Sequence, residues 1–184
     1  MAESAVMIAI GTVLSLWTFV GPWALGGGIT VCSMLPLVLL AHRHGTKWGV
    51  FCAFVYSVLQ ALLGVQNIQY ATSFGMAVAI ILLDYTLAFS VVGLSAALNR
   101  FFRSRLAAIV TGIAVTFFVR FLCHFASGVL IWEALWPNEL GWAPEIWSLA
   151  YNISYMLPEI IITAGAALLL YKPLEKYWLG TDLK

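Results

Sequence analysis

Residues 106–132 read LAAIVTGIAVTFFVRFLCHFASGVLIW, and this stretch decides the class of fold. Arg120 and His124 are the only basic side chains in it, and the rest is almost entirely apolar. The stretch is long enough to cross a bilayer, which takes roughly 20 apolar residues in helical form. A helix satisfies all of its backbone hydrogen bonds internally, as a segment surrounded by lipid must. The stretch therefore predicts a transmembrane helix.

The rest of the chain repeats this pattern. Of its 184 residues, 62% are hydrophobic and only 9% are charged, whereas soluble domains carry roughly 25% charged residues. The net charge of +1 argues against nucleic-acid binding. We expect an all-α membrane protein, one domain over residues 1–184, with about six transmembrane helices. They are expected at about residues 4–20, 30–42, 47–64, 76–98, 106–132 and 148–171.

The basic residues predict the orientation. If six helices alternate in direction, every Lys and Arg except Arg120 falls on the side of the two termini. The loops on the opposite side carry Glu133, Glu139 and Glu145. By the positive-inside rule, both termini are then cytoplasmic. The chain is expected to be a multi-pass protein of the plasma membrane.

Four titratable residues fall inside the predicted spans: Asp84, Arg120, His124 and Glu159. Such residues are costly in lipid and often functional. The alternatives are structural: an ion pair between Arg120 and Asp84, and a hydrogen-bonded core histidine at His124. Glu159, which follows Pro158, is expected to satisfy neighbouring groups rather than touch a ligand.

One helix face carries several of the candidates. Arg120, His124, Gly128 and Trp132 recur at four-residue spacing and so share a face that leads outward. Asp84 and Asn152 fall in the outer halves of their helices. Asn152 has the alternative role of an interhelical hydrogen bond. The spacing predicts a pocket just below the outer surface.

Aromatic residues surround this predicted pocket. Stacking and cation–π attraction beside a carboxylate would suit a flat cationic ligand. The alternative is an interfacial aromatic belt, which we expect for Trp17, Trp48 and Trp178. The candidate pocket aromatics are Trp23, Trp132, Trp136, Trp142, Trp147, Tyr151 and Tyr155.

Motifs for other chemistries are missing. The sequence has no phosphate-binding Gly-rich Lys loop and no serine nucleophile elbow. Cys32, Cys52 and Cys123 lie in apolar runs without metal-ligand spacing, so we expect no metal and no cofactor. An intramembrane enzyme that uses Asp84, His124 and Glu159 is a remaining alternative. A small membrane-embedded binder without an ATPase motif needs a partner to drive transport.

Three segments resemble a known family. Residues 120–132 (RFLCHFASGVLIW), 147–159 (WSLAYNISYMLPE) and 83–89 (LDYTLAF) are similar to the helix 5, helix 6 and helix 4 signatures of the ThiT (YuaJ) family. These proteins are the thiamine-specific S components of energy-coupling factor (ECF) transporters in prokaryotes. The resemblance extends over essentially the whole chain.

The resemblance implies a six-helix protein, not an enzyme, that captures thiamine outside the cell. It implies partners as well: an EcfT transmembrane subunit and two ABC-type ATPases. By matching position, Asp84 would bind the aminopyrimidine, Trp132 would stack on it, and Ala5 and Ala9 would form the small-residue surface for EcfT. The other implied ligand-binding residues are Tyr85, His124, Gly128, Tyr151, Asn152, Arg120, Trp147 and Trp23.

One departure keeps a second ligand class open. A family tryptophan in the first loop, which helps cover the thiazolium, aligns near Gly27, with Trp23 as its nearest replacement. The pyrimidine side of the motif is intact. The alternative is therefore an S component for a thiamine precursor, such as a hydroxymethylpyrimidine, or for another flat vitamin.

Overall fold

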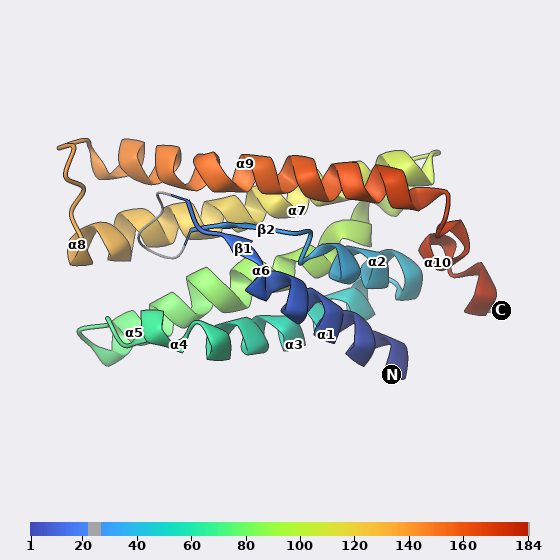
Figure 1. Ribbon diagram of the computed structural model, residues 1–184, viewed down its shortest axis with the longest axis horizontal. Coiled ribbons are helices and arrows are strands. Elements are labelled where there is room, and N and C mark those ends of the chain that lie inside the picture. Colours follow the sequence, from blue (N-terminus) through green and yellow to red (C-terminus); the bar gives the residue numbers. More distant parts are fainter. Residues whose placement is uncertain (22–26, 184) are drawn as a thin grey trace.

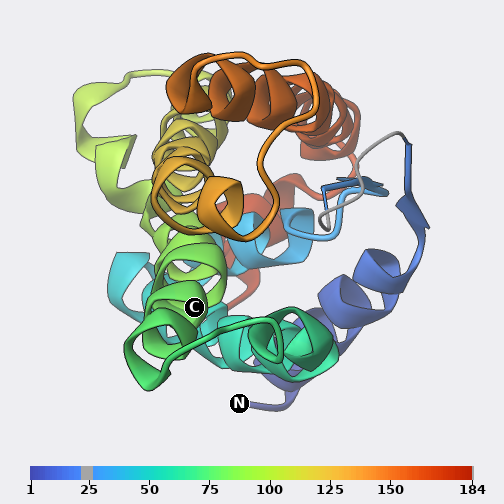
Figure 2. The same ribbon diagram turned by 90° about the vertical axis from the view of Figure 1, so that its left-hand side faces the viewer.

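The computed structural model describes residues 1–21 and 27–183. Its helices lie side by side along one long axis (Figure 1) and form a ring when seen along that axis (Figure 2). Among the described residues, four helical spans are long and apolar enough to cross a membrane: Thr46–Leu63, Phe74–Phe101, Arg105–Leu135 and Pro144–Tyr171. The predicted helical, membrane-compatible class of fold is confirmed, whereas the count of six spans stays a prediction.

The first part of the chain differs from the prediction. Helix α1 (Ala2–Leu16) ends early, and the strands β1 (Thr18–Phe19) and β2 (Ile29–Thr30) pair antiparallel, with Thr18 opposite Thr30. Helix α2 (Leu35–His44) begins five residues later than expected, with Pro36 in its first turn. Proline is favoured there because the first amide hydrogens of a helix have no partner inside it. The expectation of helices alone is therefore wrong between α1 and α2.

Helix α2 lies at the centre of the bundle. All its residues from Leu35 to Arg43 are buried, and it packs against α1, α3 (Thr46–Leu63) and the C-terminal helix α10 (Glu175–Leu179). Its ten residues span only about 15 Å, half of a bilayer core. The strands β1 and β2 therefore lie before one end of α2 in the bundle, and the C-terminal segment covers the other end of this helix.

The two spans after α3 are continuous but contain irregular turns. After α4 (Val65–Ile68), α5 (Phe74–Ile80) continues through the π-helical η1 (Ile81–Leu87) and α6 (Ala88–Ser90) into the 3-10 helix η2 (Val91–Phe101). Helix α7 (Arg105–Ser127) continues through the π-helical η3 (Gly128–Trp132) into α8 (Glu133–Leu135). Such π turns are rare and occur often at functional sites. The last long helix is α9 (Pro144–Tyr171).

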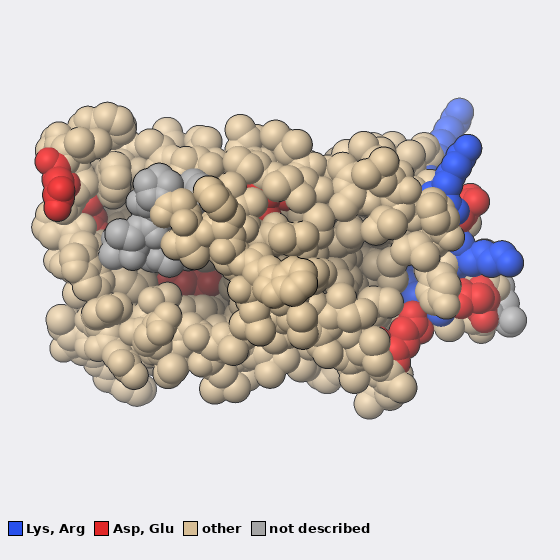
Figure 3. Space-filling view, viewed as in Figure 1, with Lys and Arg blue, Asp and Glu red and all other residues tan. Residues whose placement is uncertain are grey.

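Both termini lie at the same end of the bundle (Figure 1), and the Lys and Arg side chains visible on the face in Figure 3 gather at that end. Arg43, at the end of α2, bonds both carboxylate oxygens of Asp182 at 2.6 and 2.8 Å, and its Nε lies 2.5 Å from Glu3 Oε1. Asp182 belongs to the short helix η4 (Thr181–Leu183). These bonds fasten the C-terminal segment to α1 and α2.

Trp178 corrects one sequence expectation. The residue was expected in an interfacial belt, but its side chain is 0% exposed. Its ring packs edge-on against His42, and Nε1 donates to Leu170 O at 3.4 Å. The chain turns after α9, so α10 packs against the end of α2 near His42 and carries Trp178 into the core. Trp17, by contrast, is 68% exposed.

Candidate ligand-binding site

A cavity of about 390 Å³ lies among the helix ends remote from the termini. Its wall includes Ser15 and Leu16 at the end of α1, Gly64 and Asn67 around α4, and the first turns of α9 from Trp147. Further wall residues come from the two π-helical segments, η1 and η3, from α3, α6, α7 and α8, and from the segment around β1 and β2. Cavities of this size suit a small-molecule ligand.

The structure brings the predicted site residues together. Nine of them line this one cavity: Asp84, Tyr85, Arg120, His124, Gly128, Trp132, Trp147, Tyr151 and Asn152. Trp23 lies outside the described residues. The shared location agrees with the predicted pocket, and the role of each residue toward a ligand stays a prediction.

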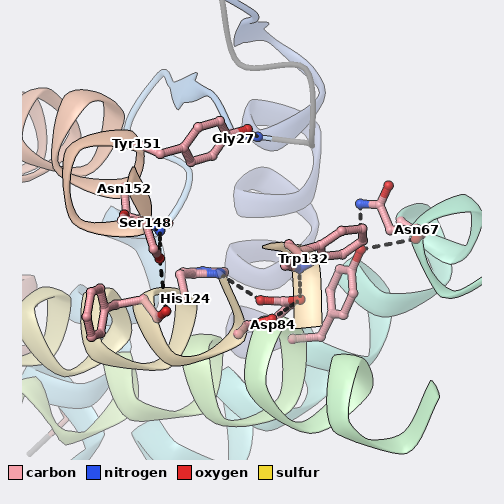
Figure 4. Close-up of polar contacts among 12 residues, drawn as sticks. Gly27, Asn67, Asp84, His124, Trp132, Ser148, Tyr151 and Asn152 are labelled. Atoms are coloured by element: carbon pink, nitrogen blue, oxygen red, sulfur yellow. Dashed lines mark hydrogen bonds and ion pairs between the residues drawn. The ribbon is translucent and has the colours of Figure 1, made fainter. Parts of the chain in front are cut away.

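Asp84 is the centre of the polar network in the cavity (Figure 4). Its Oδ2 accepts hydrogen bonds from Trp132 Nε1 at 2.9 Å and from Ser127 Oγ at 2.8 Å, and its Oδ1 lies 3.2 Å from His124 Nδ1. An ionised carboxylate offers about four acceptor positions, so Oδ1 can accept one more hydrogen bond. The alternative of an ion pair between Asp84 and Arg120 is wrong, because Arg120 pairs with Glu159 instead.

His124 presents its second ring nitrogen for binding. Because the ionised Asp84 can only accept, Nδ1 carries the hydrogen in their bond. Nε2 is buried and has no hydrogen-bond partner among the described residues. In the neutral ring this nitrogen is an acceptor, suited to an amine or hydroxyl donor of a ligand.

Arg120 has a different acidic partner from the one that the sequence suggested. Its Nη1 donates to Glu159 Oε2 at 2.7 Å, and the guanidinium lies 4.8 Å from the centre of the Phe89 ring. Thr30 Oγ1 donates to the other carboxylate oxygen of Glu159 at 2.5 Å. As predicted, Glu159 satisfies neighbouring groups. The pair joins α7, α9 and β2 beneath the cavity.

The bond to Asp84 fixes the plane of the Trp132 ring. Trp136 stacks on Trp132 with ring centres 5.8 Å apart and planes 18° from parallel, and Tyr70 packs edge-on against Trp136 at 4.5 Å. A third ring between the two indoles would need about 7 Å, twice the contact distance of carbon atoms. A flat ligand would therefore stack on the other face of Trp132.

Gly128 marks a close approach of two helices. A Cβ at this position would collide with Ser148 Oγ, so the space beside Gly128 is filled by Ser148. Ser148 Oγ donates to Phe125 O at 2.9 Å and joins α9 to α7. The glycine thus permits α9 to lie against η3, where both line the cavity.

The α9 residues form their own network. Asn152 Nδ2 donates to Ser148 O at 2.9 Å, and its Oδ1 accepts from Tyr155 Oη at 2.6 Å. These bonds of Asn152 lie within its own helix, and the interhelical bond, which was the alternative role of Asn152, is made by Ser148. Tyr151 Oη accepts from Gly27 N at 3.3 Å, and the Trp147 ring packs against Tyr151.

The cavity wall also contains Asn67, Gln60 and Glu133, which were not among the predicted site residues. Tyr85 Oη donates to Gly64 O at 3.0 Å and accepts from Asn67 Nδ2 at 3.1 Å, which positions η1 against α4. Gln60, near the end of α3, and Glu133, directly after Trp132, also face the cavity. Gln60 is a polar residue inside an apolar run, a signal that would have identified it.

Comparison with known proteins identifies the family. The model for thiamine transporter proteins (Thia_YuaJ) matches residues 1–178. The chain belongs to the thiamine transporter family. It is 26% identical over 178 residues to the thiamine transporter ThiT of Bacillus subtilis (strain 168), which covers 92% of this chain and 88% of that protein.

A solved structure of ThiT from Listeria monocytogenes has the same fold. The match has a TM-score of 0.76 at 24% identity and covers 96% of this chain and 95% of the other. Membership of the thiamine transporter family identifies the chain as a membrane protein for thiamine uptake and confirms the prediction that it is not an enzyme. The alternative of an intramembrane enzyme built on Asp84, His124 and Glu159 is thereby set aside.

Proposed function

We propose that the chain is the thiamine-binding S component of an ECF importer in a prokaryotic plasma membrane. It forms one domain over residues 1–184 with six membrane-spanning segments and both termini in the cytoplasm. The cavity then opens toward the outside, remote from the basic end of the bundle. The Asp84 network carries this proposal, because it combines a fixed carboxylate, an aromatic plane and an available histidine nitrogen in one site.

The roles of the site residues follow from this geometry. The remaining acceptor position on Asp84 Oδ1 receives the exocyclic amine of the aminopyrimidine. His124 Nε2, which has no hydrogen-bond partner among the described residues, is a second polar atom in the same cavity wall. The ring stacks on the face of Trp132 opposite Trp136. Tyr151, Trp147 and Asn152 form the facing wall on α9.

The chain contains no ATPase motif, so delivery of the vitamin requires partners. We assign that part to an EcfT subunit and two ABC-type ATPases, with α1 as the docking helix. Ala5 and Ala9 are exposed on α1, whereas Ser4, Ile8 and Gly11 face inward. A stripe of small exposed residues lets another helix approach closely.

Titration of the detergent-purified protein with thiamine, followed by intrinsic tryptophan fluorescence, tests the binding function. Quenching is expected at sub-micromolar thiamine, and it is lost in Trp132→Ala. Trp17→Phe, which removes an exposed tryptophan outside the cavity, is the control and keeps the quenching. If the hydroxymethylpyrimidine or another flat vitamin quenches the fluorescence and thiamine does not, the substrate assignment is wrong, while the fold assignment is unaffected.

A further inference from the structure

Glu133 stands in the cavity wall directly after Trp132, outside the network around Asp84. Its Oε1 accepts two hydrogen bonds from Asn138, from the backbone N at 3.1 Å and from Nδ2 at 2.8 Å. Its Oε2 is buried and has no hydrogen-bond partner in the part of the chain that the structure describes. A buried polar atom without a partner is costly unless a ligand or water satisfies it.

The outer loop holds this carboxylate in place. Asn138 Nδ2 also donates to Trp142 O at 2.9 Å, and Trp142 N donates to Asn138 Oδ1 at 2.9 Å. The connection from α8 to α9 is thus folded around Glu133. A carboxylate fixed in this way loses little freedom when a ligand binds, which favours affinity.

The charges of the described cavity wall do not balance. Arg120 is neutralised by Glu159, which lies beneath the wall. Asp84 and Glu133 then leave an excess of negative charge. Asp84 already accepts from three side chains, whereas Glu133 keeps a whole oxygen unused. In a cavity of low dielectric constant this excess favours a cationic ligand.

We propose that Glu133 recognises the positive charge of the ligand, with Oε2 facing the thiazolium ring while Asp84 holds the pyrimidine. This inference rests on the proposed thiamine-binding function. The pocket thereby selects the charged vitamin over a neutral molecule of the same shape.

The experiment compares thiamine with 3-deazathiamine, a neutral analogue in which a thiophene replaces the thiazolium. Calorimetry on purified protein gives both dissociation constants for the wild type, Glu133→Gln and the control Glu139→Gln, an exposed acid in the same loop. We expect Glu133→Gln to weaken thiamine binding roughly tenfold and to leave binding of the analogue unchanged. The control changes neither constant.

Other outcomes separate the two proposals. If the wild type binds thiamine but Glu133→Gln leaves both constants unchanged, or weakens both equally, the inference is overturned and the binding function stands. If the wild type binds no thiamine, the proposed function fails and this inference fails with it. If Glu133→Gln does not fold, Asn138→Ala is tested in its place, because this variant frees the Glu133 carboxylate from its hydrogen bonds to the Asn138 side chain and keeps the negative charge. That variant must lose affinity for thiamine and not for the analogue, and the opposite result overturns the inference.

Discussion

Arg120 Nη1 lies 2.7 Å from Glu159 Oε2, and this ion pair is buried beneath the cavity, with the Glu159 side chain 1% exposed. The second oxygen of Glu159 accepts from Thr30 in β2. One carboxylate therefore joins α7, α9 and the strand that follows the first loop. The pair neutralises Arg120, which is the one Lys or Arg side chain among the described residues of the cavity wall.

Removal of this acid is expected to destabilise the fold. Glu159→Gln leaves the Arg120 guanidinium buried without a counter-charge, which costs about 3–5 kcal/mol of unfolding free energy. Thermal unfolding of the detergent-purified protein measures the change. Glu145→Gln, an exposed acid on the same helix, is the matched control and should not alter the melting temperature. Equal melting temperatures for both variants would contradict a structural role for the pair.

Asp84→Asn is expected to weaken thiamine binding by about 100-fold. Three side chains donate to Asp84, so the amide nitrogen of Asn must face one of these donors, and the hydrogen bonds to a charged acceptor are lost. Hydrogen bonds to charged groups contribute about 1.5–3 kcal/mol. Ser127→Ala removes one donor but keeps the carboxylate, so its effect on affinity in the same titration should be tenfold or less. A larger loss in Ser127→Ala than in Asp84→Asn would show that the hydroxyl, not the charge, controls the site.

Gly128 and Ser148 are expected to behave as a coupled pair. A Cβ at residue 128 collides with Ser148 Oγ, so Gly128→Ala pushes α9 away from η3 and lowers both the melting temperature and the affinity for thiamine. Ser148→Ala removes the colliding atom, and the double variant should therefore recover much of the loss. Measurement of the two single variants and the double variant gives the coupling directly. Additive losses would mean that the two positions do not share space.

The sequence predicted much of the site because its signals are local. Four-residue spacing along one helix placed Arg120, His124, Gly128 and Trp132 on one face, and all four line the cavity. Spacing along the sequence gives the depth of a residue in the membrane. It does not give the direction in which the side chains of neighbouring helices point. The partner of Arg120 was therefore misjudged between two acids, Asp84 and Glu159.

The remaining errors have tertiary causes. The strands β1 and β2 have two residues each, too short to show an alternating pattern. The burial of Trp178 depends on α10 packing against the end of α2, a contact between segments more than 100 residues apart. The π turns that place Asp84 and Trp132 in the wall leave no periodic signal in the sequence either.

The attachment of the C-terminal segment is expected to depend on pH. The Arg43 guanidinium holds the pKa of the Asp182 carboxyl below its usual value. A carboxyl with a lowered pKa in the folded state adds stability above its unfolded pKa, and this contribution is lost as the pH falls through the folded value. Between about pH 5 and pH 2, the wild type should therefore lose stability more steeply than Asp182→Asn. Protease cleavage of the C-terminal segment as a function of pH measures the difference, and parallel curves for both proteins would count against the bond.

The exposed face of α1 is expected to mediate assembly and not vitamin binding. The double variant Ala5→Trp and Ala9→Trp places two large rings on a surface where another helix must approach closely, and both positions are exposed in the isolated chain and absent from the cavity wall. Thiamine affinity should remain unchanged, while co-purification with EcfT and the two ATPases should be abolished. Ala150→Trp, an equally exposed substitution on α9, is the control for the added bulk in the membrane. The control adds a ring to the same kind of surface, so loss of assembly in the α1 variant alone would assign the contact to α1. Normal assembly of the α1 variant would exclude α1 as the docking helix.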